Sequence, residues 1–164
     1  MKLHLNPIPA PLTAWSPLVW LVTWGHSGRV APASGTWGTL AALPFVIYIR
    51  YLGGGLSLIG FALVCFLAGL YAIPRYTAYT ENKDPPEIVL DEVAGIALTF
   101  IAAPHLDILT ILFGFTLFRA LDALKPGPIG WCDRKLKGGM GVMMDDIVAG
   151  IVASLCVYGL QQII

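Results

Sequence analysis

Residues 56–73 carry no charged side chain and no proline, and this run constrains the fold more than any other feature of the sequence. A helix that spans a bilayer needs about 20 predominantly apolar residues, and this run comes close to that length. The composition agrees, because 57% of the residues are hydrophobic and the mean hydropathy is +0.75, whereas soluble domains are about 45–50% apolar. The sequence therefore indicates burial in a membrane.

Further apolar runs cover residues 39–52, 93–103, 108–121 and 147–164. Arg50, near the end of the first, can extend its guanidinium to the interface, and Gly53, Gly54 and Gly55 predict a turn between two antiparallel helices. The runs 93–103 and 108–121 are short, so we expect a helical hairpin that crosses fully, with re-entrant or interfacial helices as the alternative. The sequence predicts one all-α domain over residues 1–164, a polytopic membrane bundle of about four to five apolar helices.

The charged residues indicate the orientation of this bundle. If all five runs cross, the amino terminus and the connections 73–91 and 122–146 share one side, which carries nine of the ten Lys and Arg residues. Such a bias predicts a cytoplasmic side, and all five tryptophans fall there too. Residues 1–13 do not resemble a cleaved signal peptide. Charged residues make up only 12% and balance to zero, which disfavours nucleic acid binding.

Five carboxylates fall at one membrane depth on this side. Asp91 and Glu92 precede an apolar helix, Asp122 follows another, and Asp145 and Asp146 open the last one. Hard oxygen ligands gathered in this way suit Mg²⁺, which is typically bound by a few carboxylates and by substrate phosphate oxygens. A metal-activated water or a carboxylate could then attack phosphorus, and the sequence leaves both open.

The simpler interpretation of these acids is helix capping, because carboxylates at helix starts satisfy free N–H groups and complement the helix dipole. Capping needs one carboxylate per helix, however, and does not explain two adjacent acids at two separate helix starts. Adjacent like charges repel unless a cation lies between them. We therefore expect Asp91, Glu92, Asp122, Asp145 and Asp146 to supply a metal site, and Asp91, Asp122, Asp145 and Asp146 to include the catalytic base or nucleophile.

Cationic residues lie beside these acids in the sequence. Arg119, Asp122 and Lys125 are spaced by three, so they form a stripe on a helix that ends near Pro126. These residues could form simple salt bridges at the helix end, or they could form a phosphate-binding site. Phosphoryl transfer requires metal ligands and cations side by side, which favours phosphate binding by Arg119, Lys125 and Lys137.

Two glycine-rich stretches could approach the same phosphate. The run before Asp145, with Gly138, Gly139 and Gly141, permits a curled backbone with inward N–H groups, and Gly139 is our candidate for a phosphate contact. Before the first apolar run, Thr36 could donate a hydrogen bond to phosphate, whereas Thr39 is expected to cap the helix.

The remaining reactive residue types show no pattern of a site. The three histidines are scattered, so structural or solvated roles are expected, and the three cysteines lack any CxxC pairing, which disfavours zinc and a disulfide framework. No P-loop, nucleophile elbow or HExxH motif occurs, which disfavours nucleotide hydrolases, serine hydrolases and zinc proteases.

Four blocks of the sequence resemble the phosphatidylglycerophosphatase A family. They are APASGTWGTLAAL at 31–43, LDEVAGI at 90–96, FRALDALKPGPI at 118–129 and DRKLKGGMGVMMDDIVAG at 133–150, in the family's order. The resemblance implies an all-helical fold. It also implies Mg²⁺-dependent removal of the terminal phosphate from phosphatidylglycerophosphate, at the cytoplasmic face of a bacterial inner membrane.

Two other classes of protein are alternatives. In a small transporter or channel, intramembrane acids would line an ion path, but residues 56–73 and 147–164 contain no Asp, Glu, Lys, Arg or His. In a soluble, non-catalytic helical binding module, the apolar runs would form an ordinary core. The need for detergent would separate this alternative from a membrane enzyme.

Overall fold

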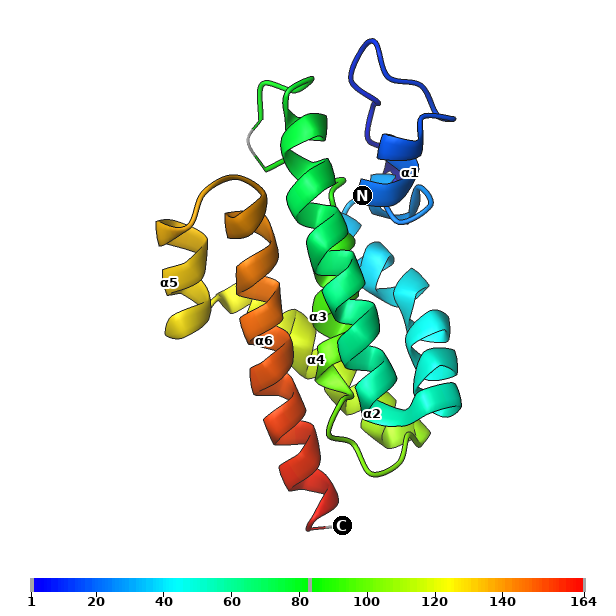
Figure 1. The fold of residues 1–164 in the computed structure, drawn as a ribbon, viewed down its shortest axis with the longest axis vertical. Coiled ribbons are helices and arrows are strands. Elements are labelled where there is room, and N and C mark those ends of the chain that lie inside the picture. The colour runs from blue at the N-terminus through cyan, green and yellow to red at the C-terminus, as the bar shows by residue number, and fades with distance from the viewer. Residues whose placement is uncertain (1, 83, 164) are drawn as a thin grey trace.

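The computed structural model describes residues 2–82 and 84–163, most of which are helical (Figure 1). The helices are α1 (Pro17–Val22), α2 (Ser34–Thr77), α3 (Leu90–Thr99), α4 (Ile108–Leu124), α5 (Pro128–Lys135) and α6 (Gly138–Gln161). A 3-10 turn, η1 (Ser27–Arg29), follows α1, and the strands β1 (His4–Leu5) and β2 (Val30–Ala31) form a small antiparallel pair. The predicted all-α class is confirmed, while α1 and the strand pair were not foreseen.

Helix α2 is broken into two antiparallel arms, as its glycines predict. Gly53 and Gly54 have non-helical backbone angles, and the Ser57 hydroxyl donates back across the break to the Ile49 carbonyl at 2.8 Å. Figure 1 shows the chain reversing there. The break is possible because Gly54 has a φ of +69°, which glycine adopts without a steric penalty.

The first arm of α2 begins at Ser34, earlier than the apolar run suggests. Thr39 therefore lies inside the helix, where its hydroxyl donates to the Gly35 carbonyl at 2.7 Å, and the predicted cap at Thr39 is wrong. The small and hydroxyl residues that precede the apolar run are helical because they pack beneath the connection to α3. Gly38, for example, lies directly against the Val89 side chain.

Helix α3 forms the centre of the bundle and is almost wholly buried between α2 and α6. Its ten residues extend about 15 Å at 1.5 Å per residue, half the thickness of a hydrocarbon core. The full crossing predicted for residues 93–103 is therefore not supported. Only α2 and α6, among the described residues, are long and apolar enough to cross a membrane.

Helix α6 starts at Gly138, so Asp145 and Asp146 lie two turns inside it and do not open it as predicted. Gly139 and Gly141 belong to its first turns, and the predicted curled loop is wrong. The helix extends this far because its first turns pack closely, with Gly139 against Pro74. Capping therefore cannot explain Asp145 and Asp146.

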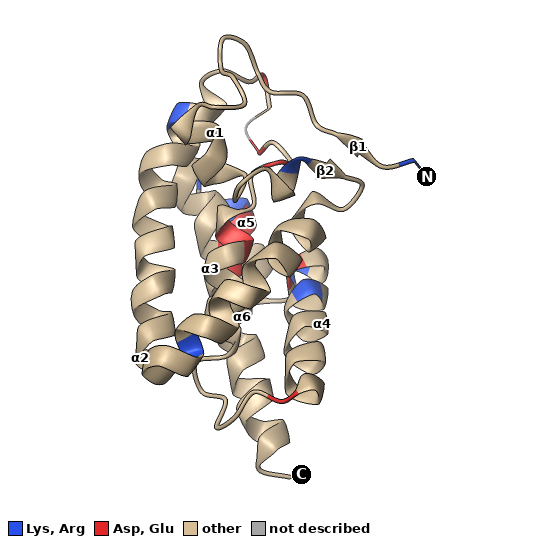
Figure 2. Ribbon diagram, turned by 90° about the vertical axis from the view of Figure 1, so that its right-hand side faces the viewer, with Lys and Arg blue, Asp and Glu red and all other residues tan. Residues whose placement is uncertain are grey.

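Charged residues gather at one end of the bundle (Figure 2). The amino terminus, α1 and α5 lie at that end, and the α2 break, the 100–107 turn and the carboxyl terminus lie at the other (Figures 1 and 2). At the second end Arg50 donates to the Ala103 carbonyl at 2.5 Å, and Asp107 caps α4 by accepting from the Thr110 amide at 2.7 Å. This is the predicted distribution of loops.

Large apolar side chains cover the outside of the bundle between these two ends. Val64 on α2 is 65% exposed and Leu155 on α6 is 66% exposed, and similar residues surround them on both helices. A soluble protein rarely leaves such continuous apolar faces on its longest helices. The exposed faces indicate a membrane protein and count against the soluble binding module.

Candidate active site

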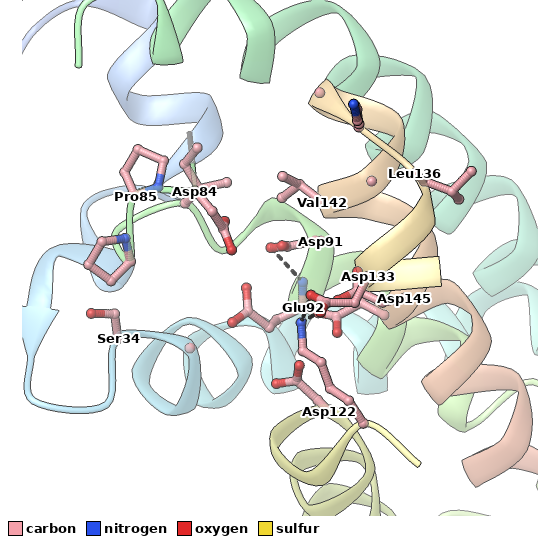
Figure 3. A pocket seen from close by; sticks show the side chains of 18 of the residues that line it. Ser34, Asp84, Pro85, Asp91, Glu92, Asp122, Asp133, Leu136, Val142 and Asp145 are labelled. Atoms are coloured by element: carbon pink, nitrogen blue, oxygen red, sulfur yellow. Dashed lines mark hydrogen bonds and ion pairs between the residues drawn. The ribbon is translucent and has the colours of Figure 1, made fainter. Parts of the chain in front are cut away.

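A cavity of about 710 Å³ opens at the charged end of the bundle (Figure 3). Its walls come from the start of α2, the connection that leads into α3, the carboxyl end of α4, α5 and the first turns of α6. Its described lining includes seven carboxylates and two lysines, namely Asp84, Asp91, Glu92, Asp122, Asp133, Asp145 and Asp146 with Lys125 and Lys137.

The five predicted acids meet in this cavity although they come from three helices. One oxygen atom from each of Asp91, Glu92 and Asp146 lies within 4.8 Å of the other two, and the same holds for Asp122, Asp145 and Asp146. The close packing of α3 on α6 accounts for this convergence. The predicted juxtaposition is confirmed as geometry.

Two basic side chains neutralise part of this negative charge. Arg119 Nη1 lies 2.6 Å from Asp122 Oδ2 and 3.5 Å from Glu92 Oε1. Lys125 Nζ lies 2.5 Å from Asp133 Oδ1 and 2.7 Å from Asp145 Oδ2. Lys125 reaches both acids because it ends α4 in a left-handed conformation, as Pro126 requires a helix end nearby.

Several carboxylate oxygens remain buried without a hydrogen-bond partner: Glu92 Oε2, Asp145 Oδ1 and Asp146 Oδ1. A buried anionic oxygen is costly unless it is paired or coordinates a metal. Because these three residues line the cavity beside further carboxylates, a divalent cation fits the donor set, and Mg²⁺ prefers such oxygen ligands. The residues present therefore fit the predicted metal.

Only some of the predicted phosphate ligands line the cavity. Lys125 and Lys137 line the cavity, whereas Arg119 holds Glu92 and Asp122 without lining it. Thr36 and Gly139 do not line it either. Their neighbours take those places in the lining: Ser34 and Gly35 at the start of α2, and Gly138 and Gly141 at the start of α6.

Three polar residues of the cavity were missed by sequence reasoning: Ser34, Asp84 and Asp133. Asp133 lies within the family block at 133–150, and Asp84 precedes Pro85 and Pro86, which were interpreted as a solvated connection. Figure 3 shows Ser34 and Asp84 across the cavity from Asp133. A short acid-rich stretch beside two prolines carries no periodicity that would have revealed Asp84.

The electrostatic environment differs between the two sides of the cavity mouth. Partial loss of water around the Asp84 carboxyl raises its pKa above the usual value. The nearby charges of Asp133 and Asp122 add to this effect, and the charge of Lys125 opposes it. Burial disfavours the charge on Lys125, but its hydrogen bonds to Asp133 and Asp145 outweigh that effect and raise its pKa. Lys125 therefore stays a fixed cation at physiological pH.

Comparison with known proteins identifies the family. A profile described as phosphatidylglycerophosphatase A matches residues 20–161, which include every helix from α2 to α6. The chain belongs to the phosphatidylglycerophosphatase A family. The predicted resemblance is confirmed.

Individual relatives agree with this family. The chain is 40% identical to the phosphatidylglycerophosphatase A of Haemophilus influenzae over 95% of both chains. It is 38% identical to that of Escherichia coli over 84% of this chain and 80% of the relative. A putative phosphatidylinositol-3-phosphatase of Bacteroides thetaiotaomicron is 29% identical, over 84% of this chain and 89% of the relative. No solved structure gives a significant match.

Proposed function

We propose that this member of the phosphatidylglycerophosphatase A family hydrolyses phosphatidylglycerophosphate to phosphatidylglycerol and phosphate, with Mg²⁺ in the cavity. One observation carries the proposal: five carboxylates from three helices converge on one cavity at the charged end of an apolar bundle. Helix capping and surface ion pairs do not account for this arrangement, because two of these acids lie inside α6 and are buried.

Asp91, Glu92, Asp122, Asp145 and Asp146 would hold the metal. Bound Mg²⁺ would neutralise charge on the transferred phosphoryl group and polarise its oxygens. Asp145 and Asp146 line the cavity and each keeps one buried oxygen without a hydrogen-bond partner, so both have an oxygen free to bind a cation.

The basic residues of the site have two different roles, either binding the substrate or orienting the acids. Lys137 and Lys125 line the cavity and would attract the phosphate, whereas Arg119 orients Glu92 and Asp122. In the reaction, the oxygen of water bonds to phosphorus and the bond from phosphorus to the glycerol oxygen breaks. A cavity carboxylate accepts the water's proton, and the glycerol oxygen leaves with a proton.

The position of the cavity suits a lipid substrate. It lies at the charged end of the molecule, and two of the elements that line it carry exposed tryptophans, Trp37 in the first turn of α2 and Trp131 in α5, whose rings favour the membrane interface. Acyl chains could then remain in the bilayer while the head group enters the cavity. We propose a multi-pass protein of the bacterial inner membrane with this cavity on the cytoplasmic face.

Phosphate release from phosphatidylglycerophosphate in mixed micelles tests the proposal. The purified chain should release phosphate with Mg²⁺ and lose this activity in a chelator, and Asp122→Asn and Asp145→Asn should each lower kcat by about 100-fold or more, as expected for charge stabilisation in the transition state. Asp107→Asn is the matched control, because Asp107 caps the start of α4 in the turn at the other end of the bundle (Figure 1), and asparagine also caps helices.

Two results would contradict the proposal. Wild-type rates in both Asp122→Asn and Asp145→Asn would show that the metal site is wrong. Faster hydrolysis of phosphatidylinositol 3-phosphate than of phosphatidylglycerophosphate would assign the substrate named for the Bacteroides relative instead.

A further inference from the structure

We infer that the cavity holds two divalent cations that share Asp146 as a common ligand. The inference rests on the proposed function, which by itself requires only one cation. The structure provides two sets of converging oxygens, Asp91 with Glu92 and Asp122 with Asp145, and Asp146 belongs to both. A carboxylate has two oxygens, so one side chain can serve two neighbouring ions.

Asp146 has the environment of a shared ligand. The residue is 2% exposed, its Oδ1 atom has no hydrogen-bond partner, and no ion pair of the described residues includes it. Every other acid in the two sets makes a hydrogen bond or an ion pair within the described part of the chain. A carboxylate this buried is retained where a charge of opposite sign is supplied to it.

Arg119 and Lys125 each engage only one oxygen of the carboxylates that they contact. Arg119 engages Asp122 through Oδ2, and Lys125 engages Asp145 through Oδ2, so Asp145 Oδ1 remains buried and unpaired. Glu92 follows the same pattern, since Arg119 faces its Oε1 atom and its Oε2 atom is unpaired. In Glu92 and Asp145, a protein cation thus engages one carboxylate oxygen and leaves the other unpaired.

The charge balance favours two ions over one. Seven carboxylates line the cavity, and the cations Arg119, Lys125 and Lys137 lie in or beside it, so four formal negative charges are uncompensated. A single divalent ion would leave two of these negative charges, which weaken the attraction for a phosphate monoester with its charge of about −1.5 to −2 at pH 7. A second ion would neutralise the site and strengthen binding of the anionic head group.

The helix packing fixes Asp146 between the two sets. Gly150 on α6 lies against the Gly95 carbonyl of α3, and a side chain at Gly95 would meet the backbone oxygen of Asp146. This contact holds Asp146 beside Asp91 and Glu92 at the start of α3. Asp122 reaches the same residue from α4, so Asp146 is the point where the three helices meet.

Binding of Mn²⁺ to the full-length chain in detergent tests the inference without relying on activity. Equilibrium dialysis should find two Mn²⁺ per wild-type chain, and electron paramagnetic resonance should show a spin-coupled pair. Asp91→Asn and Asp122→Asn should each reduce binding to one ion, because each removes a ligand from one set only. Asp146→Asn should abolish the coupling, and Asp107→Asn should keep both ions.

The outcomes separate this inference from the proposed function. One uncoupled Mn²⁺ per wild-type chain, with Mg²⁺-dependent phosphate release intact, would overturn the shared site and leave the proposed function standing. Absence of phosphate release from phosphatidylglycerophosphate would overturn the proposed function, whatever the stoichiometry. Two Mn²⁺ without spin coupling in the wild-type chain would also overturn the shared site, so the wild-type measurements can refute the inference even if a variant misfolds.

Discussion

Individual residues of the cavity depend on small neighbours that leave room for the acids. Gly35, in the first turn of α2, is the clearest case, because a Cβ atom there would meet both the Glu92 carboxylate and the Arg119 guanidinium. Both partners are themselves held by an ion pair, so neither can move without disturbing the other. The spacing of the metal ligands thus depends on the absence of a side chain.

Gly35→Ala should therefore reduce phosphatase activity by about tenfold or more, with a loss of stability of about 1–3 kcal/mol from overpacking. Phosphate release and thermal unfolding in detergent measure the two effects. Gly60→Ala is the matched control on the same helix, since no atom lies within 4 Å of its added methyl group. Equal activities of the two variants would contradict this account.

Asp84 predicts a pH dependence of stability. Its pKa is raised in the folded chain, so the folded state binds this proton more tightly and loses stability as pH rises from the ordinary value near ~3.9 through the folded value. In the presence of a chelator, Asp84→Asn should therefore unfold at a higher temperature than wild type at pH 7. The difference should disappear below about pH 4, where the carboxyl is protonated in both states.

At the scale of helices, the crossing of α3 and α6 determines where the acids meet. Gly150 and Gly95 allow the two backbones to approach closely one turn from Asp146, and such small residues are a common feature of membrane helix contacts. Larger residues at this crossing would push α6 away from α3. The carboxylates of the two helices would then separate.

Gly150→Ala should destabilise the protein by about 1–3 kcal/mol and reduce Mn²⁺ binding. Gly159→Ala, about two and a half turns further along α6, should instead be neutral or stabilise by up to about 1 kcal/mol, because its methyl group meets open space and alanine is the better helix former. Thermal unfolding of the two variants is the measurement. A stabilised Gly150→Ala variant would show that the crossing is looser than described.

The sequence predicted which helices exist better than where they begin. Apolar runs located α2, α4 and α6, and glycines located the break in α2. The starts of α2 and α6 were placed several residues late, because Ser34, Gly35 and Gly138 have poor helix propensity and are helical only through tertiary packing. Because the predicted start of α6 was too late, Asp145 and Asp146 were expected at its first turn although they lie inside the helix.

The candidate site was predicted in its acids and only partly in its other residues. Asp91 and Asp146 could be recognised because paired acids beside apolar helices are unusual. Ser34 and Asp84 could not, since only the folded chain brings the start of α2 and the connection before α3 to the same cavity. Arg119 was recognised, and its spacing already offered a salt bridge to Asp122, whereas its contact with Glu92 on another helix required coordinates.

At the scale of the whole molecule, the charged end and the apolar outer faces define an orientation in the membrane. In a background without the native cysteines, Lys137→Cys should react with an impermeant maleimide in inside-out vesicles and be protected in right-side-out vesicles. Asp107→Cys should show the opposite pattern, because Asp107 precedes the start of α4 at the far end of the bundle (Figure 1). Labelling of both positions from one side would contradict the proposed orientation.

The interior position of Asp145 and Asp146 on α6 limits how this chain can change in length. Adding one residue between Gly138 and Asp145 would turn everything before the insertion by about 100° relative to the acids. The lysine and glycines of the opening turn would then point elsewhere while the acids stayed in place. Insertions and deletions among homologues should consequently collect in the 100–107 turn, where no such rotational register exists.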